Sequence, residues 1–506
     1  MSDATTAPNP VEARLREIHS GPGGPRIAAF FDFDGTIVEG VTPARVGLSR
    51  LFGGNAASPL LPGLSGRKRA THYLSVQRMI AENWRGRPTE ELMEAEEQLF
   101  QNHIARNLYP EAWELVRAHQ RAGHTVILAT SATGFQTRRL AAELGIDHIL
   151  CTEPAVSGGR ITGEIDGEIV WEHSKADLVE KFAVAHEIDL AESFSYSNGG
   201  VDTPMLRLTG NPTAVNPDRA LAYEATGQGW PILRFERRRP GPYRIVRTLL
   251  GALAMVAAAA ATFLCSLTSD RRAEIDRMYR WVSTATLRCL GLRVRVIGGH
   301  KARAARPAVF VFNHQSQIDS MIIPYILRES FTPVVTIKAK HYPVFGPLLR
   351  FVGTVFIDRS TPGGAQEALN SLVTQLHRGR SVAIAPEGRV SATPRLQDFK
   401  KGAFHLAAQA GVPMVPIVIC NAGRALWRRA LIVRPGTIDV TILDPIDTSS
   451  WAQENLDEQI AAVRRLYLDT LERWPDASGA SLPSEPENQH AVVALDPPHR
   501  HRPGSR

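Results

Sequence analysis

The stretch IAAFFDFDGT, residues 27–36, joins five apolar residues to two aspartates. A short run without polar residues is typical of a strand buried on both faces of a parallel sheet. Side chains two positions apart on an extended segment point the same way, so Asp32 and Asp34 are expected to face one site. One would act as a nucleophile and the other as a general acid or base. Gly35 and Thr36 allow the chain to turn while backbone N–H groups approach a phosphate.

The same pattern continues along the first half of the chain. A second apolar run, TVILA at 125–129, ends in Thr130-Ser131, and a helix is expected over 135–144 with Gly145 as its C-cap. Residues of about 40–120 have a helical character. The alternation of helices and apolar strands predicts a doubly wound α/β domain over residues 26–235.

A second α/β domain is expected over residues 276–475. Its apolar strands are predicted at 308–312, 355–357, 381–385 and 415–419. The first of them leads into NHQSQID at 313–319. If the residues between them turn, His314 can serve as a general base and Asp319 can orient its imidazole.

An uncharged apolar run, Thr248–Thr268, lies inside the segment 236–275 between the two domains. Its 21 residues are long enough to span a bilayer. Arginines crowd both ends, which suits a segment lying in one leaflet with both ends on the same side. The arginines are Arg237, Arg238, Arg239, Arg244 and Arg247 before the run, and Arg271, Arg272, Arg277 and Arg280 after it. We favour membrane association; a buried core helix is the alternative.

The composition limits the other possibilities. The net charge of +7 is compatible with an anionic lipid surface or a phosphorylated ligand. Four widely spaced cysteines form no CxxC pair, so neither a disulfide framework nor a zinc site is expected. Residues 1–25 lack the apolar core of a secretory signal and are expected to be disordered, as is the tail over 476–506.

Further motifs place the first domain beside a known family. Ser131 follows the second strand, Lys175 lies in His173-Ser174-Lys175, and VNPD at 215–218 looks like a closing strand and turn. With the DxDGT motif, these resemble the phosphoserine-phosphatase-like branch of the haloacid dehalogenase superfamily. The resemblance implies that the helical insertion of about 40–120 is a cap domain. It also implies that Ser131 binds phosphate and that Lys175 neutralises charge.

The fourth motif departs from that family. The family usually has Gly-Asp-Ser-x-x-Asp, whereas this chain reads SNGGVD at 197–202. The resemblance implies a magnesium site formed by Asp32, Asp34, Asn198 and Asp202. Asn198 supplies an oxygen but no charge, so the affinity for magnesium is expected to be reduced. The domain is then either a magnesium-dependent phosphomonoesterase or a non-catalytic sensor of a phosphorylated ligand.

Four motifs in order identify the second domain as similar to the glycerolipid acyltransferases. After NHQSQID come GTVFIDR at 353–359, PEG at 386–388 with FKKGAF at 399–404, and VPMVP at 412–416. The domain looks like a 1-acylglycerol-3-phosphate acyltransferase. The resemblance makes His314 the base on the acceptor hydroxyl and Asp319 its partner.

The resemblance also assigns the acceptor site. Arg359 would bind the acceptor phosphate with bidentate geometry, and Glu387 and Gly388 would shape the pocket. The family commonly reads Glu-Gly-Thr-Arg-Ser, but residues 387–391 read EGRVS, which displaces the arginine by one position. Residues that can compensate are Arg389, Lys400 and Lys401.

The resemblance implies acylation of lysophosphatidic acid at sn-2 to give phosphatidic acid, and the apolar run places this reaction on the cytoplasmic face of the cell membrane. Another lysophospholipid acceptor is the alternative. The expected partners are acyl-CoA or an acyl carrier protein, a lysophospholipid and an anionic membrane surface. Nucleic acid is not expected as a partner.

Overall fold

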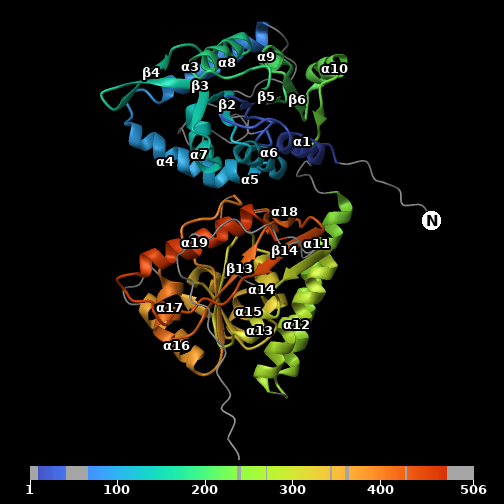
Figure 1. The fold of residues 1–506 in the computed structure, drawn as a ribbon, viewed down its shortest axis with the longest axis vertical. Coiled ribbons are helices and arrows are strands. Elements are labelled where there is room, and N and C mark those ends of the chain that lie inside the picture. The colour runs from blue at the N-terminus through green and yellow to red at the C-terminus, as the bar shows by residue number, and fades with distance from the viewer. Residues whose placement is uncertain are drawn as a thin grey trace, which may run out of the picture.

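The computed structural model describes residues 9–40, 67–235, 241–268, 270–341, 345–358, 364–391, 393–427 and 430–475. These residues form two α/β domains stacked end to end, with the N-terminal domain above the C-terminal one in Figure 1. The expected linker residues 236–240 and the expected tail 476–506 lie outside the described residues, as does the segment 41–66 of the expected cap.

The N-terminal domain is built on a seven-stranded sheet in the order β4-β3-β2-β1-β5-β6-β7. β3 and β4 pair in an antiparallel way, and the other neighbours are parallel. The strands are β1 (Ala28–Phe31), β2 (Thr125–Thr133), β3 (His148–Ser157), β4 (Arg160–Asp166), β5 (Phe194–Ser197), β6 (Asn211–Val215) and β7 (Ile232–Leu233). The predicted doubly wound α/β fold is confirmed.

The central strand β1 explains why this sheet is covered on both faces. All four of its residues are buried. Ala29 and Phe31 belong to one hydrophobic cluster, whereas Ala28 and Phe30 belong to another. Successive side chains of a strand point to opposite faces, so an unbroken apolar run requires helices on both sides. The helices are α1 (Pro10–Ser20), α3 (Arg67–Asn83), α4 (Thr89–Leu99), α5 (Ala105–Asn107), α6 (Pro110–Arg121), α7 (Gly134–Leu144), α8 (His173–Ala185), α9 (Thr203–Leu208) and α10 (Arg219–Gln228).

The N-terminal segment differs from its prediction. Residues 10–20 form α1, although disorder is expected over 1–25. Val11, Arg14 and Ile18 recur at helical spacing and are buried, and α1 packs against α6 and β7. One buried helical face stabilises a segment whose composition alone suggests disorder. Helix α6, at the end of the expected cap, also packs against β2 of the central sheet.

The C-terminal domain has a second seven-stranded sheet in the order β11-β10-β12-β9-β13-β14-β8. Only β13 and β14 pair in an antiparallel way among the described strands of this sheet. Its strands are β8 (Leu292–Ile297), β9 (Val309–Phe312), β10 (Phe331–Thr336), β11 (Val355–Ile357), β12 (Ser381–Ile384), β13 (Met414–Ile419) and β14 (Gly436–Ile442). Its helices are α11 (Pro242–Cys265), α12 (Arg271–Leu290), α13 (Lys301–Ala304), α14 (Asp319–Leu327), α15 (Phe345–Phe351), α16 (Gly364–His377), α17 (Gly402–Ala410), α18 (Ala422–Ala425) and α19 (Leu456–Glu472).

Helix α11 lies along the side of the C-terminal domain, next to α12 (Figure 1). It begins six residues before the predicted apolar run and ends at Cys265. Among the described residues it is the one helix long and apolar enough to cross a membrane, and only 11% of its most apolar 18-residue stretch is buried. Leu249, Leu250 and Leu253 are more than half exposed. Helix α11 is therefore not a buried core helix of the protein.

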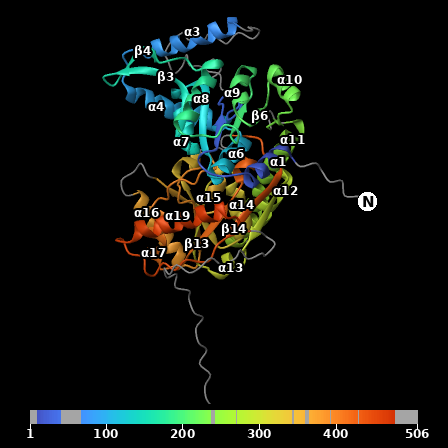
Figure 2. The same ribbon diagram turned by 45° about the horizontal axis from the view of Figure 1, so that its top comes forward.

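The two domains are held together by specific contacts. Trp427 belongs to a hydrophobic cluster made mainly of N-terminal residues, and its Nε1 donates to the Ala105 carbonyl at 2.8 Å. Arg424 pairs with Glu114 of α6. The interface is formed by the side of the N-terminal domain that carries α5, α6 and α7 (Figures 1 and 2).

Candidate active sites

Three strands bring the predicted phosphatase residues to one edge of the first sheet. β1 lies between β2 and β5 and is parallel to both. Segments that follow neighbouring parallel strands meet at the carboxyl edge of the sheet, where ligands of such folds bind. Asp32 follows β1 and Asn198 follows β5, whereas Ser131 lies inside β2, which runs on to Thr133.

A buried ion triad occupies this edge. Lys175 of α8 is 1% exposed, and its Nζ lies 2.8 Å from Asp32 Oδ1 and 2.9 Å from Asp202 Oδ2. Ser197 Oγ also donates to Asp202 Oδ2 at 2.5 Å. A lone lysine in a sequence is usually a solvated surface group, but here the amine holds two carboxylates that are 170 positions apart. The structure therefore brings Lys175, to which the resemblance assigns charge neutralisation, into contact with Asp32.

Burial and charge oppose each other in the triad. Burial raises the pKa of Asp32 to about 6, although the Lys175 ammonium lowers it and the Asp202 carboxylate raises it further. Burial also tends to lower the pKa of Lys175, but Asp202 and Asp32 outweigh it, and the net shift of the Lys175 pKa is upward. The two carboxylates therefore favour the charged form of Lys175 at the strand edge.

Two of the oxygen donors predicted for magnesium, Asp202 and Asn198, already contact other groups of the protein. Asp202 is already bound by Lys175 and Ser197. The Asn198 amide packs against Gly35, where a Cβ would lie 2.0 Å from Asn198 Nδ2 and where φ is +80°. In the part of the chain that the structure describes, no three His, Cys, Asp or Glu side chains gather as metal ligands would. The residues present do not fit a tightly held magnesium ion, which prefers charged oxygen ligands in octahedral geometry.

The second site is a histidine–aspartate pair at the carboxyl end of β9. His314 Nδ1 lies 2.9 Å from Asp319 Oδ2, and the Ser316 N–H donates to the same oxygen at 3.0 Å. Asp319 is fully buried and begins α14, whereas the His314 side chain is 23% exposed. The turn between the two residues makes the dyad that the spacing predicts. Burial raises the pKa of Asp319, although His314 opposes that rise.

Two neighbouring polar residues fix this turn, although no sequence motif assigns them a role. Asn313 donates to and accepts from the backbone of Ile419, which ties the end of β9 to β13. Ser316 Oγ donates to the Leu426 carbonyl at 2.6 Å. Both residues flank His314 within the NHQS segment. Their position beside a catalytic candidate is the only signal that sequence reasoning could have used.

Glu387 holds the backbone around His314. Its Oε1 accepts from the His314 N–H at 2.6 Å, and its Oε2 accepts from Ser391 Oγ and the Gln397 N–H, both at 2.8 Å. The Ser391 N–H in turn donates to the His314 carbonyl at 2.9 Å. Glu387 is 3% exposed, and burial raises its pKa. Its contacts position the histidine, and its role in shaping the acceptor pocket stays a prediction.

The predicted phosphate-binding residues are less closely assembled. Arg359 lies outside the described residues. Arg389 and Lys400 are exposed, whereas Lys401 pairs with Asp457 of α19 at 2.7 Å. Gly388 adopts a φ of +73°, a conformation that favours glycine and turns the chain after Glu387. The acceptor assignments of these residues remain predictions.

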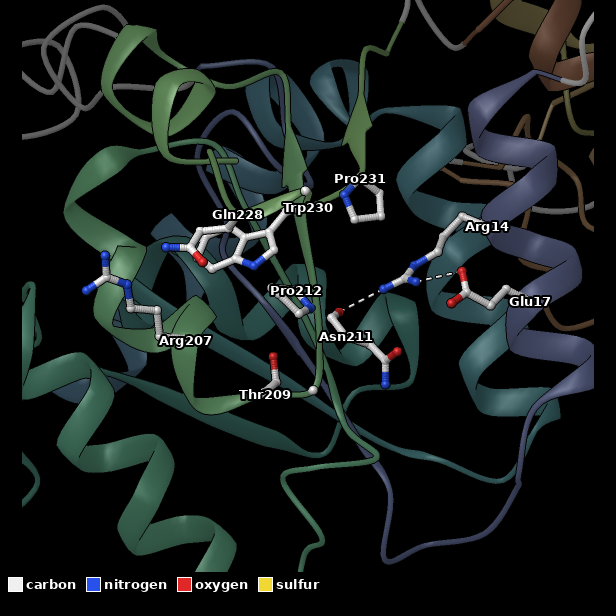
Figure 3. Close-up of a pocket in the computed structure, with 11 residues that line it drawn as sticks. Arg14, Glu17, Arg207, Thr209, Asn211, Pro212, Gln228, Trp230 and Pro231 are labelled. Atoms are coloured by element: carbon white, nitrogen blue, oxygen red, sulfur yellow. Dashed lines mark hydrogen bonds and ion pairs between the residues drawn. The ribbon is translucent and has the colours of Figure 1, made fainter. Parts of the chain in front are cut away.

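A cavity of about 600 Å³ lies at the opposite edge of the first sheet (Figure 3). It is lined by Arg14 and Glu17 of α1, by Asn211 at the start of β6 and by Trp230 just before β7. Arg14 donates to Glu17 and to the Asn211 carbonyl, both at 2.7 Å. Because it opens at the amino ends of the strands, this cavity is not part of the Asp32 site.

Comparison with known proteins agrees with this division of the chain. Residues 29–207 match the haloacid dehalogenase-like hydrolase family, whose members generally use magnesium, and residues 293–420 match the acyltransferase family. A 1-acyl-sn-glycerol-3-phosphate acyltransferase of Saccharomyces cerevisiae is 31% identical over 239 residues, 44% of this chain and 76% of that protein.

Two further similarities were found. An inhibition of morphological differentiation protein of Streptomyces azureus is 31% identical over 267 residues, 50% of this chain and 96% of that protein. The crystal structure of the 1-acyl-sn-glycerophosphate (LPA) acyltransferase PlsC from Thermotoga maritima aligns with a TM-score of 0.39 and 22% identity, covering 46% of this chain and 100% of that one.

Proposed function

Because the chain belongs to the 1-acyl-sn-glycerol-3-phosphate acyltransferase family and carries a haloacid dehalogenase-like hydrolase domain in its first half, we propose that it acylates lysophosphatidic acid at sn-2 with acyl-CoA as the donor. The product is phosphatidic acid. The observation that carries the proposal is the 2.9 Å contact between His314 and the buried Asp319.

In the proposed reaction the acceptor hydroxyl gives its proton to His314 Nε2 as its oxygen attacks the thioester carbon. A new C–O bond forms and the C–S bond breaks. The CoA thiolate leaves and takes the proton back from the imidazolium. Asp319 keeps the Nδ1 proton in place, so that Nε2 faces the acceptor as the basic nitrogen. No metal takes part in these steps.

The acceptor phosphate would be bound by the basic residues of the second and third motifs. Arg359 is the first candidate, because a guanidinium can bind a phosphate with two parallel hydrogen bonds. The exposed Arg389 and Lys400 add positive charge after Glu387. An acyl carrier protein as the donor, or another lysophospholipid as the acceptor, would use the same chemistry.

The exposed apolar face of α11 supports a location at the membrane surface. Leu249 is 63% exposed and Leu253 is 64% exposed, and Trp281 of α12 is 72% exposed. Apolar side chains next to arginines suit the boundary between headgroups and acyl chains. We place this face in the cytoplasmic leaflet, where both the amphiphilic acceptor and a soluble donor are accessible.

The N-terminal domain is proposed as a phosphomonoesterase, because a buried Lys175 stands beside the candidate nucleophile Asp32. Asp32 would attack phosphorus as the ester P–O bond breaks, and Asp34 would protonate the leaving alcohol. Water would then hydrolyse the aspartyl phosphate. A non-catalytic sensor of a phosphorylated ligand is the second candidate, favoured by the uncharged Asn198.

Product analysis of the purified protein tests both proposals. Acyl-CoA is offered with a panel of lysophospholipids, and phosphomonoesters such as phosphoserine are offered with magnesium. His314→Ala is expected to abolish acyl transfer without unfolding the protein, and Asp32→Asn is expected to abolish phosphate release. Acyl transfer that persists in His314→Ala rules out the dyad. Phosphate binding without turnover, unchanged by Asp32→Asn, favours the sensor.

A further inference from the structure

Helix α7 of the phosphatase-like domain reaches the acyltransferase site. It begins at Gly134, after the strand that carries Ser131, and its last turn contains Glu143. This helix lies on the side of the N-terminal domain that faces the C-terminal domain (Figures 1 and 2). Glu143 is 4% exposed, so its carboxylate is buried between the two domains.

The Glu143 carboxylate contacts the segment between the two parts of the third acyltransferase motif, PEG and FKKGAF. Its Oε1 accepts from Thr393 Oγ1 at 2.7 Å and from Gln397 Nε2 at 3.4 Å. Its Oε2 pairs with Arg139 at 3.1 Å, one turn earlier on α7. Arg395 Nη1 donates to the Ala142 carbonyl at 2.7 Å, which adds a second anchor at the same helix end.

The same segment is tied at both ends to Glu387 and His314. Ser391 Oγ and the Gln397 N–H both donate to Glu387 Oε2, and Glu387 Oε1 accepts from the His314 N–H. The segment is therefore linked to the catalytic histidine on one side and to α7 on the other. Arg464 of α19 also donates to the Leu396 and Gln397 carbonyls, at 3.2 and 3.3 Å. A surface loop is ordinarily free to move, but this one is fastened to a different domain.

We propose that Glu143 is a positioning residue for acyl transfer, which orders residues 393–397 so that Glu387 holds His314 in its reactive position. The proposal rests on the proposed acyltransferase function. It gives the phosphatase-like domain a part in the second reaction that does not depend on its own catalysis. A displacement of about 1 Å at a reacting group can reduce a rate about 100-fold.

Two variants and one matched control test this role in the full-length protein. Glu143→Ala removes both acceptor oxygens, whereas Glu143→Gln keeps an oxygen for Thr393. Glu114→Ala removes an interdomain ion pair, with Arg424, without touching the segment 393–397. We expect Glu143→Ala to reduce kcat by about 10- to 100-fold with the KM for acyl-CoA unchanged. Glu143→Gln should recover most of the rate, and Glu114→Ala should match the unsubstituted protein.

Hydrogen exchange supplies a readout that does not require activity. The Ser391 and Gln397 amides, which donate to His314 and Glu387, should exchange faster in Glu143→Ala than in Glu114→Ala. Equal kcat values in all variants overturn the proposal. Equal losses of kcat in Glu143→Ala and Glu114→Ala also overturn it, because they indicate an effect of domain docking alone. If the unsubstituted protein transfers no acyl group, the proposed function fails, and the exchange rates alone decide whether Glu143 orders the segment.

Discussion

Replacing Asp319 with asparagine removes the negative charge of the dyad but keeps its hydrogen bonds. Asp319 Oδ2 accepts two hydrogen bonds, from His314 Nδ1 at 2.9 Å and from the Ser316 N–H at 3.0 Å. An asparagine whose amide oxygen takes the place of Oδ2 still accepts both. The imidazole keeps its orientation, but the negative charge that stabilises the imidazolium is lost.

The size of the expected rate loss follows from the distance between the imidazolium and the carboxylate. The imidazolium and carboxylate charges lie about 4 Å apart, which corresponds to about 4 kcal/mol at an effective dielectric constant of about 20. Each 1.36 kcal/mol changes a rate about tenfold. We therefore expect Asp319→Asn to reduce kcat by about 1,000-fold. The buried amide NH2 that replaces Oδ1 should cost about 1–3 kcal/mol of folding free energy.

The assay is the release of CoA with lysophosphatidic acid as acceptor, accompanied by a denaturant unfolding curve for each variant. Asp444→Asn is the matched control, because Asp444 is an 85% exposed partner of Lys301 in the same domain. That variant should keep its full activity. If Asp319→Asn retains more than a tenth of the kcat while His314→Ala is inactive, then the carboxylate does not stabilise the imidazolium and the reasoning is refuted.

Three further predictions concern the ion triad, the metal site and α11. Lys175→Met leaves Asp32 and Asp202 buried without their cation, so unfolding free energies should fall by about 3–5 kcal/mol. Burial raises the pKa of Asp32, and a carboxyl with a raised pKa destabilises the folded protein as pH rises, so the loss should be larger at pH 8 than at pH 5; a pH-independent loss contradicts the triad. Asn198→Asp adds a charged oxygen ligand, and phosphate release at sub-saturating magnesium should rise at least tenfold; an unchanged rate means that Asn198 does not limit metal binding. Leu249→Ser combined with Leu253→Ser should weaken binding to anionic vesicles, measured by co-sedimentation, at least tenfold, whereas Met93→Ser, at an exposed site on α4, should not. Equal vesicle binding by both variants would mean that α11 does not contact the membrane.

Much of the fold could be predicted from local patterns. The run of residues 27–31 has no polar position, which is typical of a strand covered on both faces. The helix that ends at Gly145 was predicted because glycine adopts the left-handed conformation, and its φ is +68°. Helix α1 was missed because its buried face includes Arg14, a residue that sequence patterns count as exposed.

In the candidate sites, too, contacts within one turn could be predicted, whereas contacts between distant segments could not. His314 and Asp319 were predicted together because five positions along one turn are enough to bring them into contact. Glu387 was predicted as a pocket residue, but its hydrogen bonds to the His314 backbone depend on how β9 and β12 pair in the sheet. No spacing in the sequence reports that pairing.

The sequence by itself determined the chemistry that this protein carries, because carboxylates, a histidine and a basic loop occur in fixed local patterns beside apolar strands. Tertiary structure alone decided which distant groups meet. Lys175 joins Asp32 and Asp202 only after three segments converge on one sheet edge. Glu143 meets Thr393 across 250 positions, in a different domain. Such contacts arise from the packing of whole elements, and the burial that makes them strong exists only in the folded chain.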